Sequence, residues 1–164
     1  MKLTQLFFLF VLSGSCLAQN LQQEINEQVW KPFISSFNNR DAAGFLAVHS
    51  KQVVRSPLDS KIILTWDEYL KKQEEGNKIS LDKGNTRSVY LRFTNRIAKD
   101  GTAIDIGIFK VIVNQPDGAT RSVYGRFHVV MRKEQNIWKI LVDMDSSEGN
   151  SIDETDFIAA SPME

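Results

Sequence analysis

Hydrophobic residues recur at every fourth position near the beginning of the chain. The repeat consists of Leu21, Ile25, Val29, Phe33 and Phe37. This spacing predicts an amphipathic helix with one buried face. Pro32 falls inside the repeat and cannot donate a backbone hydrogen bond, so we expect the helix either to kink there or to restart with Pro32 in its first turn.

Two further helices and one short extended piece are predicted before the pattern changes. They cover residues 42–48, 66–75 and 52–55, respectively. Asp41 is a plausible N-cap for the first of these helices. Thr65 and Glu68 have the spacing of a capping box, which would open the second, and Gly76 is expected to close it.

From residue 87 onward the hydrophobic pattern has a period of two, which predicts β-strands. The four strands expected are 87–98, 102–114, 120–133 and 137–146. Asp100-Gly101 and Asp117-Gly118 are typical two-residue hairpin turns, and Gln135-Asn136 is a weaker one. Helices followed by such a meander predict an α+β fold in which three N-terminal helices pack on a four-stranded antiparallel sheet.

These turns also predict the register of the sheet, because a hairpin turn sets which residues face each other. The last hairpin would pair His128 with Asp143 and Arg126 with Asp145. The middle hairpin would pair Ile108 with Phe127, and the first would pair Arg96 with Asp105.

This register gives the sheet two different faces. The apolar face would carry Phe93, Ile97, Ile104, Ile106, Ile108, Ile112, Val123, Phe127, Val129, Met131, Ile140, Val142 and Met144. The mixed face would carry Tyr90, Arg92, Thr94, Phe109, Tyr124, Arg126, His128, Asp143 and Asp145. The pattern alone does not decide which face the helices cover.

The first eighteen residues predict a secretory signal peptide. Lys2 precedes an apolar run over residues 6–12, which is much shorter than the roughly 20 residues needed to span a bilayer. The exit sequence Cys16-Leu17-Ala18 favours cleavage after Ala18, so we expect a secreted or periplasmic protein. Cys16 suggests a lipoprotein as the alternative, but Ser13 stands where a lipoprotein signal would have leucine.

Charge and cysteine content narrow the possible partners. The full chain has 20 basic and 20 acidic residues, so loss of Lys2 with the signal peptide leaves a net charge of −1. A near-neutral domain is not expected to bind nucleic acid or, once the signal is removed, a membrane. Cys16 is the only cysteine, so the mature chain would have no disulfide.

The mature chain is predicted to be one α+β domain over residues 19–147, followed by an acidic tail over residues 148–164. This tail contains acids and no base. Its acids are Glu148, Asp153, Glu154, Asp156 and Glu164. We expect the tail to be mobile.

Three stretches resemble the nuclear transport factor two-like superfamily, in its SnoaL-like branch that includes relatives of ketosteroid isomerase. They are FNNRDAAGFL at 37–46, VRSP at 54–57, and GRFHVVMRK at 125–133 running into WKILVDMDSS at 138–147. The resemblance covers residues 25–147 and implies a cystatin-type, cone-shaped domain with a curved sheet and a pocket at one end. Many such relatives pair through their sheets, which implies a possible homodimer.

The resemblance also implies where the site residues lie. It places Asp143 and Asp145 inside the pocket, with His128 and Arg126 beside them. Relatives that isomerise steroids have an acid where this chain has Ser56, and a tyrosine near the position of Pro32. This difference argues against steroid isomerase chemistry.

The predicted quartet would have useful chemistry in a pocket with little water. A carboxylate orients His128 and favours its imidazolium, and Arg126 keeps a carboxylate ionised and can bind an anion. His128, Asp143 and Asp145 are therefore the candidate catalytic residues. The alternative is a ladder of exposed ion pairs across the strands, which contributes little.

Other residues are candidate ligand contacts. They are Arg126, Tyr124, Tyr90, Arg92 and, near the pocket mouth, Arg55. We predict no metal site, because the two histidines are far apart in sequence and no metal-binding motif is present. No cofactor-binding motif is present either.

Three functions remain open from the sequence. The first is an exported binding domain for a small, partly apolar organic molecule. The second is a cofactor-free isomerase, lyase or cyclase that uses a His-Asp pair, and the third is a protein-interaction module with a vestigial pocket. The sequence does not decide whether the protein is an enzyme.

Overall fold

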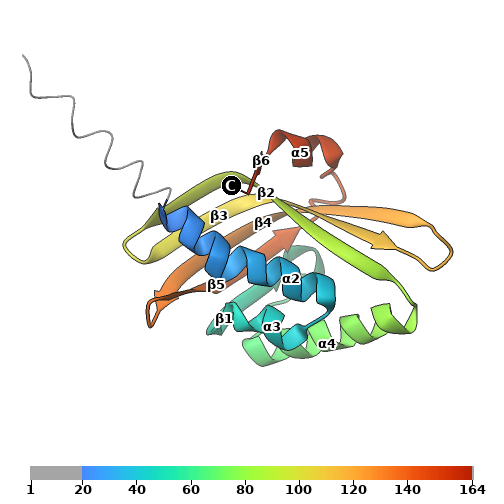
Figure 1. Ribbon diagram of the computed structural model, residues 1–164, viewed down its shortest axis with the longest axis horizontal. Helices are drawn as coiled ribbons and strands as arrows, with labels where there is room; N and C mark the ends of the chain where they lie inside the picture. The colour runs from blue at the N-terminus through green and yellow to red at the C-terminus, as the bar shows by residue number, and fades with distance from the viewer. Residues whose placement is uncertain (1–19, 164) are drawn as a thin grey trace, which may run out of the picture.

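The computed structural model describes residues 20–163 and consists of a curved sheet with helices on both of its faces (Figure 1). The predicted signal peptide lies outside the described residues. Six strands form the sheet in the order β1-β5-β4-β3-β2-β6. The strands are β1 His49–Pro57, β2 Thr86–Lys99, β3 Thr102–Asn114, β4 Thr120–Glu134, β5 Ile137–Ser146 and β6 Ser161–Pro162.

The helical elements begin within the first described residues. Residues 20–25 are helical and lead into the π-helical segment η1. The helical elements from there on are η1 Asn26–Trp30, α2 Lys31–Asn39, α3 Ala42–Ala47, η2 Leu58–Ser60, α4 Trp66–Asp82 and α5 Glu154–Ala159. Helices α2, α3 and α4 lie on the concave face of the sheet, and α5 lies on the opposite face (Figure 1).

The α+β fold is confirmed, but it has more strands than the predicted meander. The meander strands were predicted nearly to their ends, whereas β1 and β6 extend the sheet at its two edges. Strand β1 contains the predicted extended piece and pairs parallel to β5, so the sheet is mixed. Strand β6 pairs with β2 at Phe93 and Arg92.

The first helix restarts at the proline, one of the two outcomes expected. The backbone N–H of Lys31 donates to the carbonyl of Asn26, which gives a wider π turn just before Pro32. Pro32 then lies in the first turn of α2, where it has no helical hydrogen bond to lose.

The predicted helix caps are present, but the last helix before the sheet is longer than expected. Asp41 accepts a hydrogen bond from the Gly44 N–H at 2.8 Å, as an N-cap does. The Thr65 and Glu68 capping box opens α4. Helix α4 continues past Gly76 to Asp82, because a single glycine costs a helix only about 1 kcal/mol.

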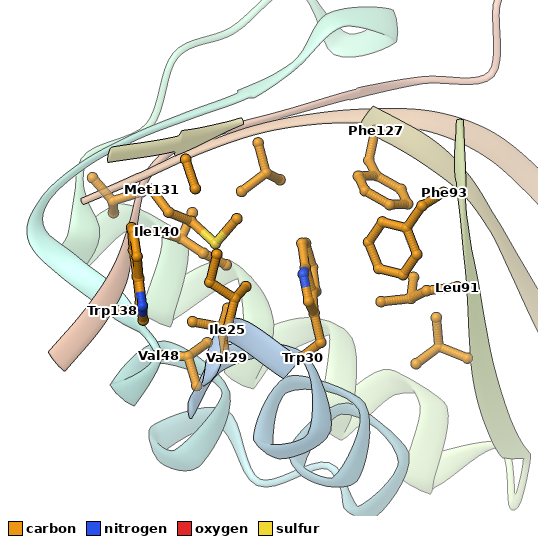
Figure 2. Packing of buried hydrophobic residues seen from close by; sticks show 14 residues of the cluster. Ile25, Val29, Trp30, Val48, Leu91, Phe93, Phe127, Met131, Trp138 and Ile140 are labelled. Atoms are coloured by element: carbon orange, nitrogen blue, oxygen red, sulfur yellow. The ribbon is translucent and has the colours of Figure 1, made fainter. Parts of the chain in front are cut away.

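The core lies between the N-terminal helix and the concave face of the sheet. Trp30 faces two rings of the sheet (Figure 2), with its ring centroid 5.6 Å from that of Phe93 and 5.4 Å from that of Phe127. Ile25, Val29, Met131, Trp138 and Ile140 complete the fully buried centre. Burial of these side chains fixes the helix on the sheet, since each contributes about 1.5–3 kcal/mol.

The register differs from the prediction by one residue at three places. Two are β-bulges, where one strand has an extra residue: Thr94 in β2 and Leu141 in β5. The third is the β3–β4 turn, where Gln115 and Ala119 are hydrogen-bonded around a three-residue loop that ends in Gly118 at φ +87°. The Asp100-Gly101 turn and the pairing of Arg96 with Asp105 are confirmed.

Each one-residue shift exchanges the two faces of the strand beyond it. Phe93, Phe127, Val129, Met131 and Ile140 of the predicted apolar face do lie under the helices. The prediction is wrong for the isoleucines of β3, because the three-residue turn points them outward. Ile104 is 42% exposed, and Ile97 of β2 is 56% exposed beyond the bulge at Thr94.

The acidic tail is ordered, contrary to the expectation that it would be mobile. Its Ile152 and Ala160 are buried against Ile108 on the outer face of the sheet. Its acids meet bases of that face: Glu154 pairs with Lys110 at 2.6 Å, and Glu148 pairs with Arg126 at 2.7 Å. The tail therefore has both an apolar anchor and opposite charge beneath it.

This packing predicts different outcomes for two isoleucines of the tail. Ile152→Ala should lower the free energy of unfolding by about 2 kcal/mol, because it removes a buried side chain. Ile158→Ala, at a position 61% exposed, should change it by less than about 0.5 kcal/mol. Urea unfolding measures both, and equal, negligible changes would mean that the tail does not pack.

Candidate functional site

A cavity of about 320 Å³ lies between the helices and the concave face of the sheet. Most of its wall is aromatic or aliphatic: Trp30, Phe33, Phe37, Phe45, Pro57, Leu64, Val89, Leu91, Phe109, Val111, Phe127 and Val129. The polar part of the wall consists of Arg55, Tyr69, Lys72, Gln73, Asp143 and Asp145. Such a wall suits an apolar molecule that carries a few hydrogen-bonding groups.

The bulge at Leu141 turns two acids of β5 into this cavity. Before the bulge, Ile140 faces the core; after it, the inward positions are Asp143 and Asp145, whose partners on β4 are Val129 and Phe127. The two carboxylates are thus surrounded mainly by apolar side chains. Carboxylates in such surroundings require charged or hydrogen-bonding partners.

Asp143 has three such partners from two elements, α4 and β1. The Tyr69 hydroxyl of α4 donates to its Oδ2 at 2.9 Å. The His49 Nε2 at the start of β1 lies 3.3 Å from the same oxygen. Arg55 of β1 places Nη1 3.6 Å from Oδ1 and donates to the Asp143 carbonyl at 3.3 Å.

His49 has an acceptor at each ring nitrogen. Its Nδ1 lies 3.0 Å from the carbonyl of Phe45, and its Nε2 faces the Asp143 carboxylate. Both ring nitrogens of His49 thus lie close to an oxygen atom that can only accept a hydrogen bond. The side chain of His49 has no exposed surface, and its role is therefore to anchor Asp143.

The partners of Asp143 keep it ionised. Burial by itself would raise the pKa of Asp143, but the positive charge of Arg55 and the hydrogen bonds from His49 and Tyr69 outweigh it and lower the pKa from 3.8 to about 2. Burial, together with the Asp143 charge, raises the pKa of Tyr69 well above its usual value. Tyr69 therefore stays protonated and remains a hydrogen-bond donor.

Asp145 has a different environment, although it is only two residues away. Its Oδ2 accepts from Arg55 Nη2 at 2.6 Å, and its side chain is 29% exposed. Burial raises the pKa of Asp145, and Arg55 offsets this only in part. Of the two carboxyl groups, Asp145 is the one that can exchange a proton or a hydrogen bond with a molecule in the cavity.

Three of the eight predicted site residues reach the cavity: Arg55, Asp143 and Asp145. The prediction that His128 and Arg126 lie beside the two acids is wrong, because the bulge at Leu141 shifts the pairing. His128 faces Met144, and Arg126 faces Ser146. Both side chains lie on the outer face, where His128 is exposed.

Most of the other predicted ligand contacts hold the tail instead. Arg92 donates to the carbonyls of Ile158 at 2.9 Å and Ala160 at 3.0 Å, at the C-terminal end of α5. The Tyr124 hydroxyl donates to Glu154. Tyr90 is 49% exposed on the same outer face, and the expected homodimer stays a prediction.

His49 and Tyr69 were missed as members of the site. A signal existed for Tyr69, because the capping box at Thr65 fixes the rotation of α4 and places Tyr69 one turn into the helix. No local pattern marks His49, which reaches Asp143 only because β1 pairs with β5. The residues of a single predicted strand pair therefore could not indicate it.

Two further properties concern the described residues. Between residues 20 and 163 no cluster of three His, Cys, Asp or Glu side chains has the geometry to hold a metal ion. No helix in this range combines the length and the apolar character needed to cross a membrane.

No family model matches the sequence, and no curated protein matches it. Solved structures do match the fold. An NTF2-like protein with a cystatin-like fold from Novosphingobium aromaticivorans has a TM-score of 0.67 at 11% identity, over 87% of this chain and 91% of that chain. ActVI-ORFA from Streptomyces coelicolor has a TM-score of 0.66 at 16% identity, over 77% and 96%, respectively.

A third match is an NTF2-like protein from Shewanella oneidensis, with a TM-score of 0.58 at 15% identity over 73% of this chain and 93% of that chain. The chain thus has the nuclear transport factor two-like (NTF2-like) fold. This is the fold that the resemblance of the sequence implied. At such identities the likeness concerns the fold alone.

Proposed function

We propose that this protein is an exported small-molecule-binding domain whose ligand lies in the cavity between the helices and the sheet. The observation that carries the proposal is the contrast within the cavity wall, in which aromatic and aliphatic side chains surround one charged group of residues. An apolar ligand gains free energy by leaving water, at roughly 25 cal/mol per Å² of buried apolar surface. The charged residues then orient it.

The polar residues indicate the chemistry of the ligand. Asp143 already has three hydrogen-bonding or charged partners, so we expect a ligand to form no strong additional hydrogen bond with it. Asp145 has a single charged partner, Arg55, and is partly exposed. The expected ligand is therefore a compact, largely apolar molecule, preferably cyclic because seven rings line the cavity, with a hydroxyl or carbonyl group that meets Asp145 and Arg55.

One observation favours a second candidate function, a cofactor-free isomerase, lyase or cyclase. The raised pKa of Asp145 brings this carboxyl group closer to the range in which it can both accept and donate a proton. The His-Asp pair at the site would then be Asp143, which lines the cavity, and the buried His49 behind it, rather than His128 and Asp143. Because His49 and Asp143 are already bonded to each other, they would hold Arg55 and Tyr69 in place while Asp145 moves the proton.

Binding of the neutral fluorescent dye phenylnaphthylamine tests whether the cavity takes apolar rings. The dye should bind the mature wild-type protein saturably. Val111→Trp places an indole at the cavity wall and should weaken binding at least tenfold, which corresponds to about 1.4 kcal/mol. Ile104→Trp, on the outer face, is the matched control and should bind like the wild type.

Equal binding by both tryptophan variants would place the dye outside the cavity and contradict the proposal. Native mass spectrometry of protein recovered from the exporting cells gives the complementary result. We expect a mass that lacks residues 1–18 and a second species that carries a small molecule. A mass that includes these residues would contradict cleavage after Ala18.

A further inference from the structure

A second hollow lies at the other end of the concave face, between the α4–β2 connection and the β3–β4 hairpin. It is a groove of about 620 Å³ lined by Lys83, Asn85, Val113, Gln115, Pro116, Asp117 and Arg121. None of these residues lines the cavity of the candidate site. The groove is therefore a separate feature of the molecule.

The two bases of the groove have no acidic partner. Within residues 20–163, neither Lys83 nor Arg121 has a carboxylate within 4 Å. Asp117 is the only acid in the lining, and its Oδ1 accepts the Ala119 N–H at 2.9 Å within the hairpin turn. The nearby Asp82 pairs with Lys78 at 2.9 Å. The local charge is consequently positive.

Two more arginines extend this positive charge behind the groove. Arg87 pairs with Val113, which pairs with Arg121, so the two arginines are two strands apart, roughly 10 Å between their Cα atoms. Arg40 donates to the carbonyl of the groove residue Asn85 and to Ser80 Oγ, the latter at 3.1 Å. In the described part of the chain neither Arg40 nor Arg87 forms an ion pair.

The hydrogen bonds of these arginines do not neutralise them. Arg87 donates to the Phe37 carbonyl at 2.9 Å and to Asn77 Oδ1 at 2.7 Å. The Nε of Arg40 is buried and has no hydrogen-bond partner. The pKa of Arg87 is lowered to about 10, mainly by burial and to a smaller extent by repulsion from Arg40. Carbonyls at helix ends carry only partial negative charge, so a net positive charge remains.

We infer that this groove binds a phosphate-type oxyanion, with Lys83 and Arg121 as its direct contacts. The planar guanidinium of Arg121 can donate two parallel hydrogen bonds to such an anion, and Lys83 supplies a compact charge. Arg40 and Arg87, which lie behind the groove, add electrostatic attraction for the anion. Asn85 also lines the groove, and its side-chain amide is a neutral hydrogen-bond donor.

Titration of the whole mature protein with inorganic phosphate, followed by heteronuclear NMR, tests this inference. The arginine Nε–H signals and the backbone amides of residues 83–87 should shift saturably. Sodium chloride at matched ionic strength should not reproduce the shifts. Because each variant removes a charged hydrogen-bond donor to the anion, Arg121→Gln and Lys83→Gln should each weaken phosphate binding at least tenfold.

Lys71→Gln is the matched control, because Lys71 is an exposed base on α4 outside the groove, and it should leave the affinity unchanged. All three substitutions are on the surface, so the variants should fold. Shifts that chloride reproduces, or an affinity that survives both groove substitutions, would show an unspecific positive surface and overturn the inference.

The phosphate group could belong to a soluble compound or to a lipid headgroup. Co-sedimentation with phosphatidylcholine vesicles, with and without phosphatidylglycerol, separates the two sources. We expect saturable phosphate binding without sedimentation, which assigns a soluble anion. Sedimentation that depends on phosphatidylglycerol and is lost in Arg121→Gln would assign the headgroup to the same groove. Neither result depends on whether the central cavity binds its ligand.

Discussion

Asp143→Ala should lower the free energy of unfolding by about 3–5 kcal/mol, because it removes one of the two counter-charges of the buried Arg55 and the carboxylate that His49 and Tyr69 share. Arg55 is 11% exposed and His49 is fully buried, and both face this carboxylate. Tyr69 would lose its acceptor as well. Urea unfolding at neutral pH measures the change.

Two variants show whether the cost comes from uncompensated charge. Asp145→Ala should cost less, because Asp145 is more exposed and has only one partner. The double variant Asp143→Leu, Arg55→Met should recover part of the lost stability, because apolar side chains replace a buried ion pair at little cost. If Asp143→Ala costs no more than Asp145→Ala, the buried network does not hold the site together.

The same network predicts how stability depends on pH. The pKa of Asp143 is about 2 in the folded protein and near 3.8 without its partners, so the folded state binds this proton less readily than the unfolded state. The stabilisation is thus complete above the unfolded pKa and is lost as the pH falls from about 4 to 2, by about 2 kcal/mol. The raised pKa of Asp145 has the opposite sign and lowers stability as the pH rises past 3.8.

Asp105→Ala should have an effect of similar size at the other end of the core. Asp105 has no exposed surface; it accepts from Trp30 Nε1 at 2.7 Å and from Arg96 Nη2 at 2.9 Å. Its loss leaves the largely buried guanidinium of Arg96 without its carboxylate and the Trp30 indole N–H without its acceptor, which should cost about 3–5 kcal/mol. It also removes the hydrogen bond that fixes the central Trp30 ring.

Asp82→Ala is the matched control for this substitution. Its ion pair with Lys78 at 2.9 Å is of the same length but is exposed, so its removal should cost less than about 0.5 kcal/mol. Asp105→Asn retains an acceptor for Trp30 and should fall between the two. A cost for Asp105→Ala as small as that for Asp82→Ala would contradict the assigned role.

The strands and helix starts could be predicted because their signals are local. Alternating apolar residues, the Asp100-Gly101 turn and the Thr65 capping box each depend on a few neighbouring residues. The face of the sheet to which each strand residue points could not be predicted. Nothing in the sequence distinguishes the bulge residues Thr94 and Leu141 from ordinary strand residues. In the β3–β4 turn, Pro116 belongs to the loop, although Asp117-Gly118 by itself has the sequence of a two-residue turn.

The site was predicted in part for the same reason. Asp143 and Asp145 were placed in the pocket by the resemblance, and the structure does turn them into the cavity. His128 was placed beside them by the resemblance and by an uninterrupted register, which the bulge breaks. The tail was expected to be mobile because it contains acids and no base. Its partners, Lys110 and Arg126, can be assigned to the outer face only once it is known to which face each strand residue points.

The bulge at Leu141 has a consequence for how such a protein can evolve. If Leu141 were paired regularly instead of bulging, Val142 would face Val129 and Met144 would face Phe127, so Val142 and Met144 would lie in the interior and both carboxylates would be turned out to water. One extra residue in β5 thus decides between a charged binding chamber and an apolar one while the order of the strands stays the same. Relatives with the same outline can therefore differ completely in interior chemistry, and the presence of this extra residue is the first position to compare among them.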